Sequence, residues 1–212
     1  MAHLRVSPSA REARRVGSLA GKVILVIGAG KGIGCSVCQQ FAAQGATLAA
    51  VDITPINLDT TAESVQNAGG TIRTYVSDIT TKMPVQGLLN QVLDDLGQID
   101  ILVNCAEVEP EKTLLEMDEC DWRRTLEVNL NGAFLLTQSA ARIMKENKAG
   151  TRNGIILHAG QRAKGMDGHS AYLVSKSALE VLVQQAKKEL AIFGIHVHLI
   201  HTVEEALEVC TA

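Results

Sequence analysis

The chain has 212 residues, of which 46% are hydrophobic, and a formal net charge of −3. This length suits one α/β domain with a full core, and the small net charge gives no electrostatic reason to expect nucleic acid or an anionic membrane as a partner. No apolar run approaches the roughly 20 residues of a membrane span. Five cysteines at irregular spacing, without a secretory signal, indicate reduced thiols and a cytoplasmic protein.

Residues 1–20 are rich in Ser and Arg and contain one acidic residue, Glu12. This composition is compatible with a mitochondrial presequence, which would place the protein in the mitochondrial matrix. It is also compatible with a short helix, because Pro8 suits a first helical turn and Ser9 and Glu12 have the spacing of a capping box. We favour an N-terminal arm or short helix.

The five apolar residues at 23–27 predict a strand buried on both faces. Four glycines follow within seven residues, and helical spacing of apolar residues continues to about residue 44. Glycines allow the backbone to approach a pyrophosphate, and a helix N-terminus offers N–H groups and a positive dipole end. The order strand, turn, helix therefore predicts a phosphate site rather than a glycine turn without a ligand. The residues assigned to it are Gly28, Gly30, Lys31, Gly32, Ile33 and Gly34.

The spacing Gly28-x-x-x-Gly32-x-Gly34 resembles the TGxxxGxG cofactor turn of the short-chain dehydrogenase/reductases. The resemblance runs from residue 19 to about 202, through Asp52, Asp78-Ile79, Asn104-Cys105-Ala106, Asn129 and the YxxxSK motif at 172–176. It implies a doubly wound parallel sheet, an α/β Rossmann fold, as a single domain over 21–202, followed by a short C-terminal tail at 203–212. It also implies NAD(P)-dependent hydride transfer between the nicotinamide and an alcohol or carbonyl substrate.

The strand predicted over 47–51 leads to Asp52. An acid at this position accepts hydrogen bonds from the adenosine ribose hydroxyls and repels a 2′-phosphate, whereas Lys31 in the glycine turn could pair with that phosphate. Because a fixed repulsion outweighs one mobile lysine, we expect NAD rather than NADP. The helix before this strand contains Cys35-x-x-Cys38, which we interpret as small residues packed on the sheet rather than as a redox pair.

A helix over 55–68, a strand over 71–77, a helix over 85–96 and a strand over 99–103 follow in the predicted order. The resemblance adds further cofactor-binding residues after these strands: Ile53, Asp78, Ile79, Asn104, Cys105 and Ala106. Two positions depart from the family pattern, since Glu107 stands where a glycine is usual and Ile27 where a threonine is usual.

The helix predicted over 126–145 has apolar residues on more than one face, which indicates a partner subunit. The resemblance implies a homodimer in which this helix and the helix predicted over 170–193 form a four-helix interface. It also implies that Asn129 supports a proton relay.

The strand predicted over 155–157 should be followed by a serine that holds the substrate oxygen, as the resemblance implies. That place falls on Ala159 or Gly160, which have no hydroxyl. The flanking His158 and Gln161 are possible donors, although both require a shift of register. The loss of one such donor slows related reactions by about 10²–10³.

Tyr172 and Lys176 are four residues apart and so share one face of a helix. Hydride transfer requires a group that gives or takes the alcohol proton, and an adjacent ammonium stabilises the deprotonated tyrosine. The resemblance implies that Tyr172 is the acid/base and that Lys176 also holds the nicotinamide ribose.

The strand predicted over 195–200 carries His196 and His198, and His201 follows. Polar residues are usual on an edge strand, so we predict an edge rather than a metal site. After this strand the sequence lacks the Pro-Gly turn, the lid and the seventh strand that the resemblance implies.

Two functions remain open from the sequence. One is an oxidoreductase that acts on a small alcohol or carbonyl, slowed by the missing serine. The other is a non-catalytic relative that binds a dinucleotide or a partner subunit, in which Tyr172 and Lys176 are residual.

Overall fold

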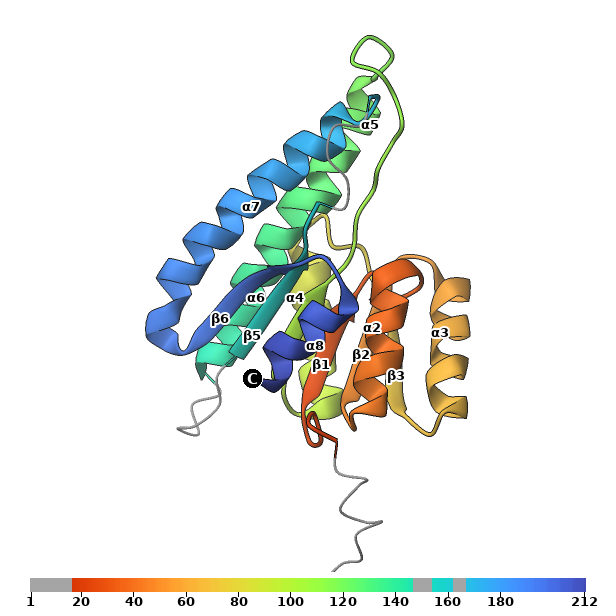
Figure 1. Ribbon diagram of the computed structural model, residues 1–212, viewed down its shortest axis with the longest axis vertical. Coiled ribbons are helices and arrows are strands. Elements are labelled where there is room, and N and C mark those ends of the chain that lie inside the picture. Colours follow the sequence, from red (N-terminus) through yellow and green to blue (C-terminus); the bar gives the residue numbers. More distant parts are fainter. Residues whose placement is uncertain (1–16, 147–153, 162–166) are drawn as a thin grey trace, which may run out of the picture.

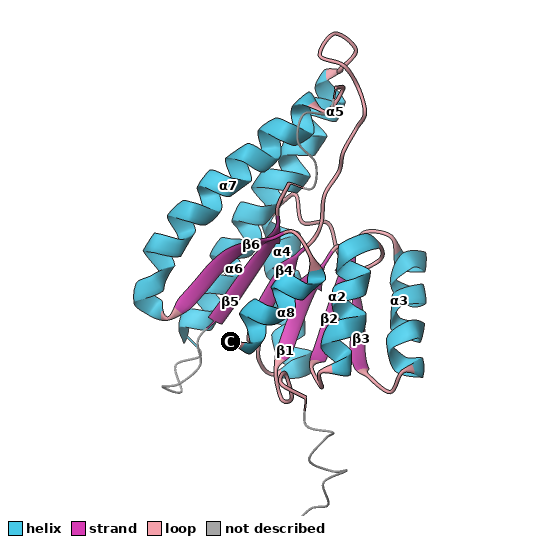
Figure 2. Ribbon diagram, in the orientation of Figure 1, coloured by secondary structure: helices cyan, strands magenta, loops and turns pink. Residues whose placement is uncertain are grey.

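The computed structural model describes residues 17–146, 154–161 and 167–212. Six parallel strands form one sheet in the order β3-β2-β1-β4-β5-β6, and helices cover both of its faces (Figures 1 and 2). The doubly wound parallel α/β fold predicted from the sequence is therefore confirmed. The strands are β1 (Val23–Ile27), β2 (Thr47–Asp52), β3 (Thr71–Val76), β4 (Ile101–Asn104), β5 (Gly154–Ala159) and β6 (Ile195–Ile200).

The helices divide between the two faces of the sheet. α2, α3 and α8 pack on one face, and α4, α6 and α7 pack on the other (Figure 1). Their bounds are α2 (Gly32–Ala43), α3 (Pro55–Asn67), α4 (Lys82–Leu96), α5 (Glu119–Leu126), a π-helical segment η1 (Glu127–Gly132), α6 (Ala133–Glu146), α7 (Ser170–Leu190), a short 3-10 turn η2 (Ala191–Phe193) and α8 (Val203–Thr211).

Strand β1 shows why the sequence forms a sheet buried on both sides. Ile24 and Val26 belong to the core beneath α2 and α3, while Leu25 and Ile27 belong to the core beneath α4 and α6. All five residues of the strand are buried, and each large apolar side chain contributes roughly 1.5–3 kcal/mol through burial. A strand with apolar residues in both phases of the pleat is stable only between two helical layers.

The winding of the chain reverses between β1 and β4, which are neighbours in the sheet but far apart in the sequence. Ile27 pairs with Asn104 at the carboxyl ends of these strands. The connections that follow the two strands leave in opposite directions, so a crevice opens between them, and ligands of doubly wound sheets bind in this crevice.

Several predicted elements differ from the structure in their bounds, and the cause is visible for two of them. The helix predicted over 126–145 begins at Glu119 and passes through the π-helical segment η1. It begins there because the Asp118 carboxylate accepts a hydrogen bond from the Asp121 N–H at 2.8 Å and caps the first turn. The strand predicted over 99–103 begins at Ile101, since the Asp100 carboxylate accepts a hydrogen bond from the Val23 N–H at 2.8 Å before the ladder starts.

The C-terminal residues assigned to a tail form helix α8. The Thr202 hydroxyl accepts a hydrogen bond from the Glu205 N–H at 3.2 Å and caps this helix. Ala206 is fully buried in the core that α2 also covers. Most of the segment predicted as an N-terminal arm, residues 1–16, lies outside the described residues.

The remaining expectations concern cysteines, metal ligands and membranes. Cys38 is buried in the core, and burial raises the pKa of its thiol, which supports packing rather than redox chemistry. β6 lies at the edge of the sheet as predicted. Within the described part of the chain, no group of His, Cys, Asp and Glu could hold a metal ion. Among the same residues, no helix is both long and apolar enough to span a bilayer.

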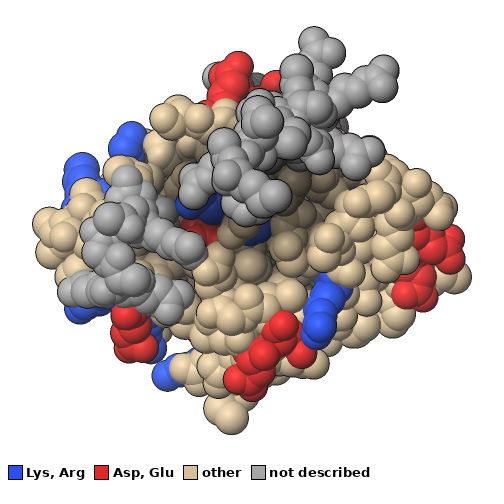
Figure 3. Space-filling model, turned by 90° about the horizontal axis from the view of Figure 1, so that it is seen from below, with Lys and Arg blue, Asp and Glu red and all other residues tan. Residues whose placement is uncertain are grey.

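The face seen from below carries small separate groups of basic and acidic side chains among other residues (Figure 3). This mixture agrees with the near-neutral net charge of the sequence and offers no argument for a polyanionic partner.

Candidate active site

A cleft of about 360 Å³ lies at the carboxyl ends of the strands, within the size range of small-molecule and cofactor sites. The glycine turn forms one wall of this cleft, with Gly28, Lys31, Gly32 and Ile33 in its lining. The first residues of α2 thus face the cleft, where a helix N-terminus favours an anion.

The glycines of the turn are required by close contacts. Gly28 has φ of +73°, and a Cβ there would lie 2.7 Å from the backbone nitrogen of Ala106. A Cβ at Gly34 would lie 2.1 Å from the carbonyl oxygen of Gly28, and one at Gly30 would lie 2.8 Å from a carboxylate oxygen of Asp52. The backbone of the turn therefore lies as close to its neighbours as a pyrophosphate cradle requires, and the residues present fit the phosphates of a dinucleotide.

Asp52 ends β2 and lines the same cleft. One carboxylate oxygen accepts a hydrogen bond from the Gly30 N–H at 2.9 Å, and the other accepts one from the Thr54 N–H at 2.9 Å. An ionised carboxylate has about four acceptor positions, so these two bonds fix its orientation and leave acceptor capacity for ribose hydroxyls.

Ile53, Asp78 and Ile79 line the cleft beyond Asp52. Burial by itself raises the pKa of the Asp78 carboxyl, but hydrogen bonds from Thr80 and the ion pair with Arg124 outweigh it and hold that pKa below its usual value. Asp78 is therefore ionised and fixed at this wall.

The segment after β4 meets the glycine turn through its backbone. The Cys105 N–H donates to the Ile27 carbonyl at 2.8 Å, and the Asn104 carboxamide accepts from the Ala106 N–H at 3.2 Å. The first of these bonds joins the two segments, and the second orders the segment after β4, although Ile27 and Glu107 both depart from the family pattern. Cys105 and Ala106 line the cleft, whereas Asn104 is buried beneath it.

His158 lies under this region and does not serve as a donor to the cleft. It is fully buried, with Nδ1 3.2 Å from the Asn104 carboxamide nitrogen and Nε2 2.8 Å from the Thr137 hydroxyl. Burial, with a smaller effect from the Lys176 charge, lowers the pKa of His158 to about 3, so its ring is neutral near pH 7. The possibility that His158 replaces the missing serine is wrong in this conformation.

Asn129 belongs to the π-helical segment η1 and links two parts of the site. Its carboxamide accepts from the Val108 N–H at 2.8 Å and donates to the Val108 carbonyl at 2.9 Å and to the Ser175 hydroxyl at 3.0 Å. Asn129 thereby fixes the residue after Glu107 and the residue before Lys176. π-helical segments are frequent at functional sites.

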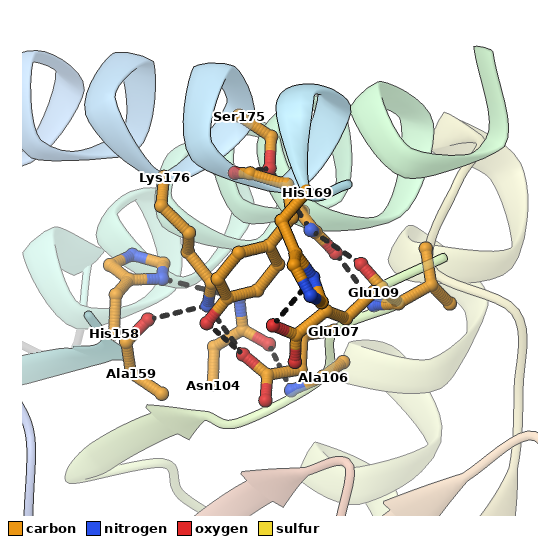
Figure 4. A network of polar contacts seen from close by, with 12 residues as sticks. Asn104, Ala106, Glu107, Glu109, His158, Ala159, His169, Ser175 and Lys176 are labelled. Atoms are coloured by element: carbon orange, nitrogen blue, oxygen red, sulfur yellow. Dashed lines mark hydrogen bonds and ion pairs between the residues drawn. The ribbon is translucent and has the colours of Figure 1, made fainter. Parts of the chain in front are cut away.

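Tyr172 and Lys176 lie four residues apart on α7, and Glu107 contacts both of them. Figure 4 shows Lys176 beside Glu107. Lys176 Nζ lies 2.8 Å from Glu107 Oε2 and donates to the Ala159 carbonyl at 2.9 Å. The Tyr172 hydroxyl donates to the same Glu107 oxygen at 3.4 Å. The structure thus brings the predicted acid/base and the predicted ribose-binding lysine together, with a carboxylate between them and the cleft.

The structure also distinguishes the two positions considered for the missing serine. Ala159 lines the cleft beside Glu107. A Cβ at Gly160, in contrast, would lie 2.8 Å from His201 Nε2. The position that faces the cleft is Ala159.

Comparison with known proteins agrees with this geometry. The family described as short chain dehydrogenase matches residues 22–204. The chain belongs to the short-chain dehydrogenase/reductase family.

Three relatives illustrate this membership. The 3-oxoacyl-(acyl-carrier-protein) reductase FabG of Thermotoga maritima is 33% identical over 184 residues, which cover 86% of this chain and 73% of that protein. The structure of NAD+-bound xylitol dehydrogenase superposes with a TM-score of 0.81 at 32% identity, over 86% of this chain and 70% of that chain. A metagenomic short-chain oxidoreductase in complex with NADP gives a TM-score of 0.85 at 25% identity, over 92% and 93%. The short-chain dehydrogenase/reductases are oxidoreductases, and as a family they bind a nicotinamide dinucleotide.

Sequence reasoning missed several residues of this short-chain dehydrogenase/reductase site. Thr54, Asn57, Ser77 and Arg124 also line the cleft. Three of them lie just after β2 and β3, so their position at the carboxyl edge of a parallel sheet was a usable signal. The pairing of Glu107 with Lys176 had no sequence signal, because 69 residues separate the partners.

Proposed function

We propose that this chain is an NAD-linked oxidoreductase that interconverts an alcohol and a carbonyl compound, with Tyr172 as the group that gives or takes the alcohol proton. The observation that supports this most is that Tyr172 and Lys176, four residues apart on α7, both contact Glu107, which lines the cleft that begins with the glycine turn. NAD, when bound, supplies the hydride acceptor.

The residues of this chain would divide the work as follows. The glycine turn and the start of α2 would hold the pyrophosphate, and Asp52 would accept the adenosine ribose hydroxyls. The Lys176 ammonium would stabilise the deprotonated form of Tyr172. Asn129 would position the segments that carry Glu107 and Lys176, through the bonds to Val108 and Ser175.

We propose NAD rather than NADP because Asp52 is fixed by two backbone donors, whereas Lys31 is exposed. A carboxylate that cannot turn away repels a 2′-phosphate more effectively than a mobile lysine attracts it. Ala159 provides no hydroxyl for the substrate oxygen, so we expect slow turnover.

Calorimetric titration with NAD+ and NADP+, combined with a panel of small alcohols and ketones, tests this function. We expect NAD+ to bind more tightly than NADP+, and the ratio of the two dissociation constants to shrink by about tenfold in Asp52→Ala. We also expect measurable oxidation or reduction of at least one compound. Asp59→Ala, an exposed acid on α3, should leave the preference unchanged. Preference of the unmodified protein for NADP+ would contradict the cofactor assignment, and inertness across the panel would contradict the activity.

We further propose that the chain forms a homodimer through α6 and α7. An apolar groove lined by Phe134, Ala141, Leu182 and Ala186 lies between these helices, and Phe134 is 45% exposed. Light scattering should give the mass of a dimer at micromolar concentration, and a monodisperse monomer would contradict this assembly.

A further inference from the structure

Glu107 stands between the cleft and the two side chains expected to act on its ligand. Glu107 lines the cleft, whereas Tyr172 is 1% and Lys176 4% exposed. Its Oε2 lies 2.8 Å from the Lys176 ammonium and 3.4 Å from the Tyr172 hydroxyl. A ligand that approaches Lys176 from the cleft therefore meets the Glu107 carboxylate first (Figure 4).

Both partners of this ion pair are held in place from outside. The residue before Glu107 is bonded to Asn104 through its N–H, and the residue after it is bonded to Asn129 through both backbone groups. The Lys176 ammonium donates to the Ala159 carbonyl at 2.9 Å. Because both segments are fixed, the contact between Glu107 and Lys176 belongs to the built structure of the site rather than to one of many surface rotamers.

The ion pair between Glu107 and Lys176 lowers the affinity for any ligand that must take the place of Glu107 at the Lys176 ammonium. A hydrogen bond to a charged group is worth roughly 10- to 100-fold in an equilibrium constant. A ribose hydroxyl that takes the Lys176 N–H now directed at Glu107 replaces a carboxylate with a neutral acceptor, and charge-assisted bonds are about twice as strong as neutral ones. Such a ligand therefore gains little from Lys176 while Glu107 is present.

The other end of the cleft carries no such competitor in the described residues. The glycine turn and Asp52 keep the close contacts that fit phosphates and a ribose, and the Asp52 carboxylate is oriented by Gly30 and Thr54. The adenosine half of a dinucleotide thus meets groups that are already oriented to bind it, whereas the nicotinamide half meets a lysine that is paired with a carboxylate.

We propose that Glu107 determines how much of a dinucleotide this cleft holds: its carboxylate occupies the Lys176 ammonium, so the complete dinucleotide binds little more tightly than its adenosine half. This inference rests on the proposed function, namely dinucleotide binding in this cleft. Glu107 is in this sense an affinity-determining residue, and the glycine usual at its position leaves Lys176 open to the ribose.

Calorimetry with NAD+ and with ADP, which carries the adenosine half alone, tests the inference. In the unmodified protein the two dissociation constants should agree within about threefold. In Glu107→Gly, NAD+ should bind about 10- to 100-fold more tightly, while ADP should change by less than about twofold. Glu107→Gln removes the charge and keeps the size of the side chain, so it should give an intermediate gain for NAD+.

Glu109→Gln is the matched control, because Glu109 lies two residues further along the same segment and faces His169 at 3.3 Å. It removes an equal charge without touching Lys176, and both dissociation constants should stay unchanged. Circular dichroism establishes that each variant is folded. Should Glu107→Gly fail to fold with Lys176 left buried, Glu107→Gln carries the test.

The inference is overturned if NAD+ binds no more tightly to the folded Glu107 variants, or if ADP gains as much as NAD+. If ADP binds but the ratio of the ADP and NAD+ dissociation constants is the same in the Glu107 variants as in the unmodified protein, this inference alone is defeated. Absence of binding of both ADP and NAD+ in every folded variant would defeat the proposed function as well.

Discussion

The two ends of the cleft follow the family pattern to different degrees. At the glycine turn, every close contact depends on the absence of a side chain, as between Gly34 and the Gly28 carbonyl. At the other end, Tyr172 and Lys176 keep the family spacing but contact a carboxylate, and the neighbouring Ala159 has no hydroxyl. We infer that the proposed binding cradle and the proposed reaction centre depart from the family pattern independently, because they are built from different strands and helices.

The largest effect is expected from removing the Tyr172 hydroxyl. Tyr172→Phe should lower turnover by at least about 10², because it removes the hydroxyl proposed to give or take the alcohol proton, while NAD+ binding at the glycine end should persist. The measurement is the steady-state rate with the best substrate of the alcohol and ketone panel.

Tyr75→Phe provides the control for this change, because Tyr75 is the other tyrosine of the sequence. It lies on β3, and its hydroxyl donates a hydrogen bond to the Asp95 carboxylate at 3.0 Å. Its rate should match that of the unmodified protein. Equal losses in both variants would show that stability, and not proton transfer, is responsible.

A restored hydroxyl should sharpen the contrast between the two ends. Ala159→Ser places a donor where negative charge develops on the substrate oxygen, and we expect the rate to rise by up to about 10²–10³. Gly160→Ser should give no gain, since a Cβ there would lie 2.8 Å from His201 Nε2. Single-turnover rates separate chemistry from product release, and equal rates for Ala159→Ser and the unmodified protein would refute this expectation.

At the glycine end, a single methyl group should be costly. A Cβ at Gly34 would lie 2.1 Å from the Gly28 carbonyl oxygen, so Gly34→Ala should reduce the free energy of unfolding by about 1–3 kcal/mol and weaken NAD+ binding. Gly87 lies in α4, and a Cβ there would point into open space, with no described atom beyond its own helix within 4 Å. Gly87→Ala should therefore stabilise the protein by about 0.5–1 kcal/mol. Urea denaturation measures both changes in the free energy of unfolding. Equal changes in the two variants would contradict the requirement for a glycine at position 34.

The last effect appears only at acidic pH and concerns the buried histidine next to Ala159. Because the pKa of His158 is lowered from 6.5 to about 3, the unfolded chain takes up a proton below pH 6.5 that the folded chain does not. The contribution of this group should therefore lower the free energy of unfolding by about 1.4 kcal/mol for each unit by which the pH is lowered between 6.5 and 3. His158→Gln should remove this contribution. The free energy of unfolding is measured from pH 7 to pH 5 in both proteins, and the same dependence on pH in both would rule the contribution out.

Local patterns in the sequence were sufficient for most of the fold. β1 was predicted with its observed bounds, because an unbroken apolar run between turn residues identifies a strand of a doubly covered sheet. β6 was also predicted with its observed bounds, although it alternates apolar residues with His196 and His198. The start of α5 was missed, since its signal is one capping residue, Asp118, and not an apolar period. The π-helical turn at Asn129 was missed as well, because its altered backbone hydrogen bonding leaves no mark in a 3.6-residue pattern.

By itself, the sequence determined the strand segments, the glycine turn and the spacing of Tyr172 and Lys176 on one helix, because all three depend on residues a few positions apart. Only the tertiary structure decided which of Ala159 and Gly160 faces the cleft, that His158 is buried away from it, and that Glu107 binds Lys176. These outcomes depend on contacts between the ends of β4 and β5 and the start of α7, whose relative positions arise only when the whole sheet is assembled.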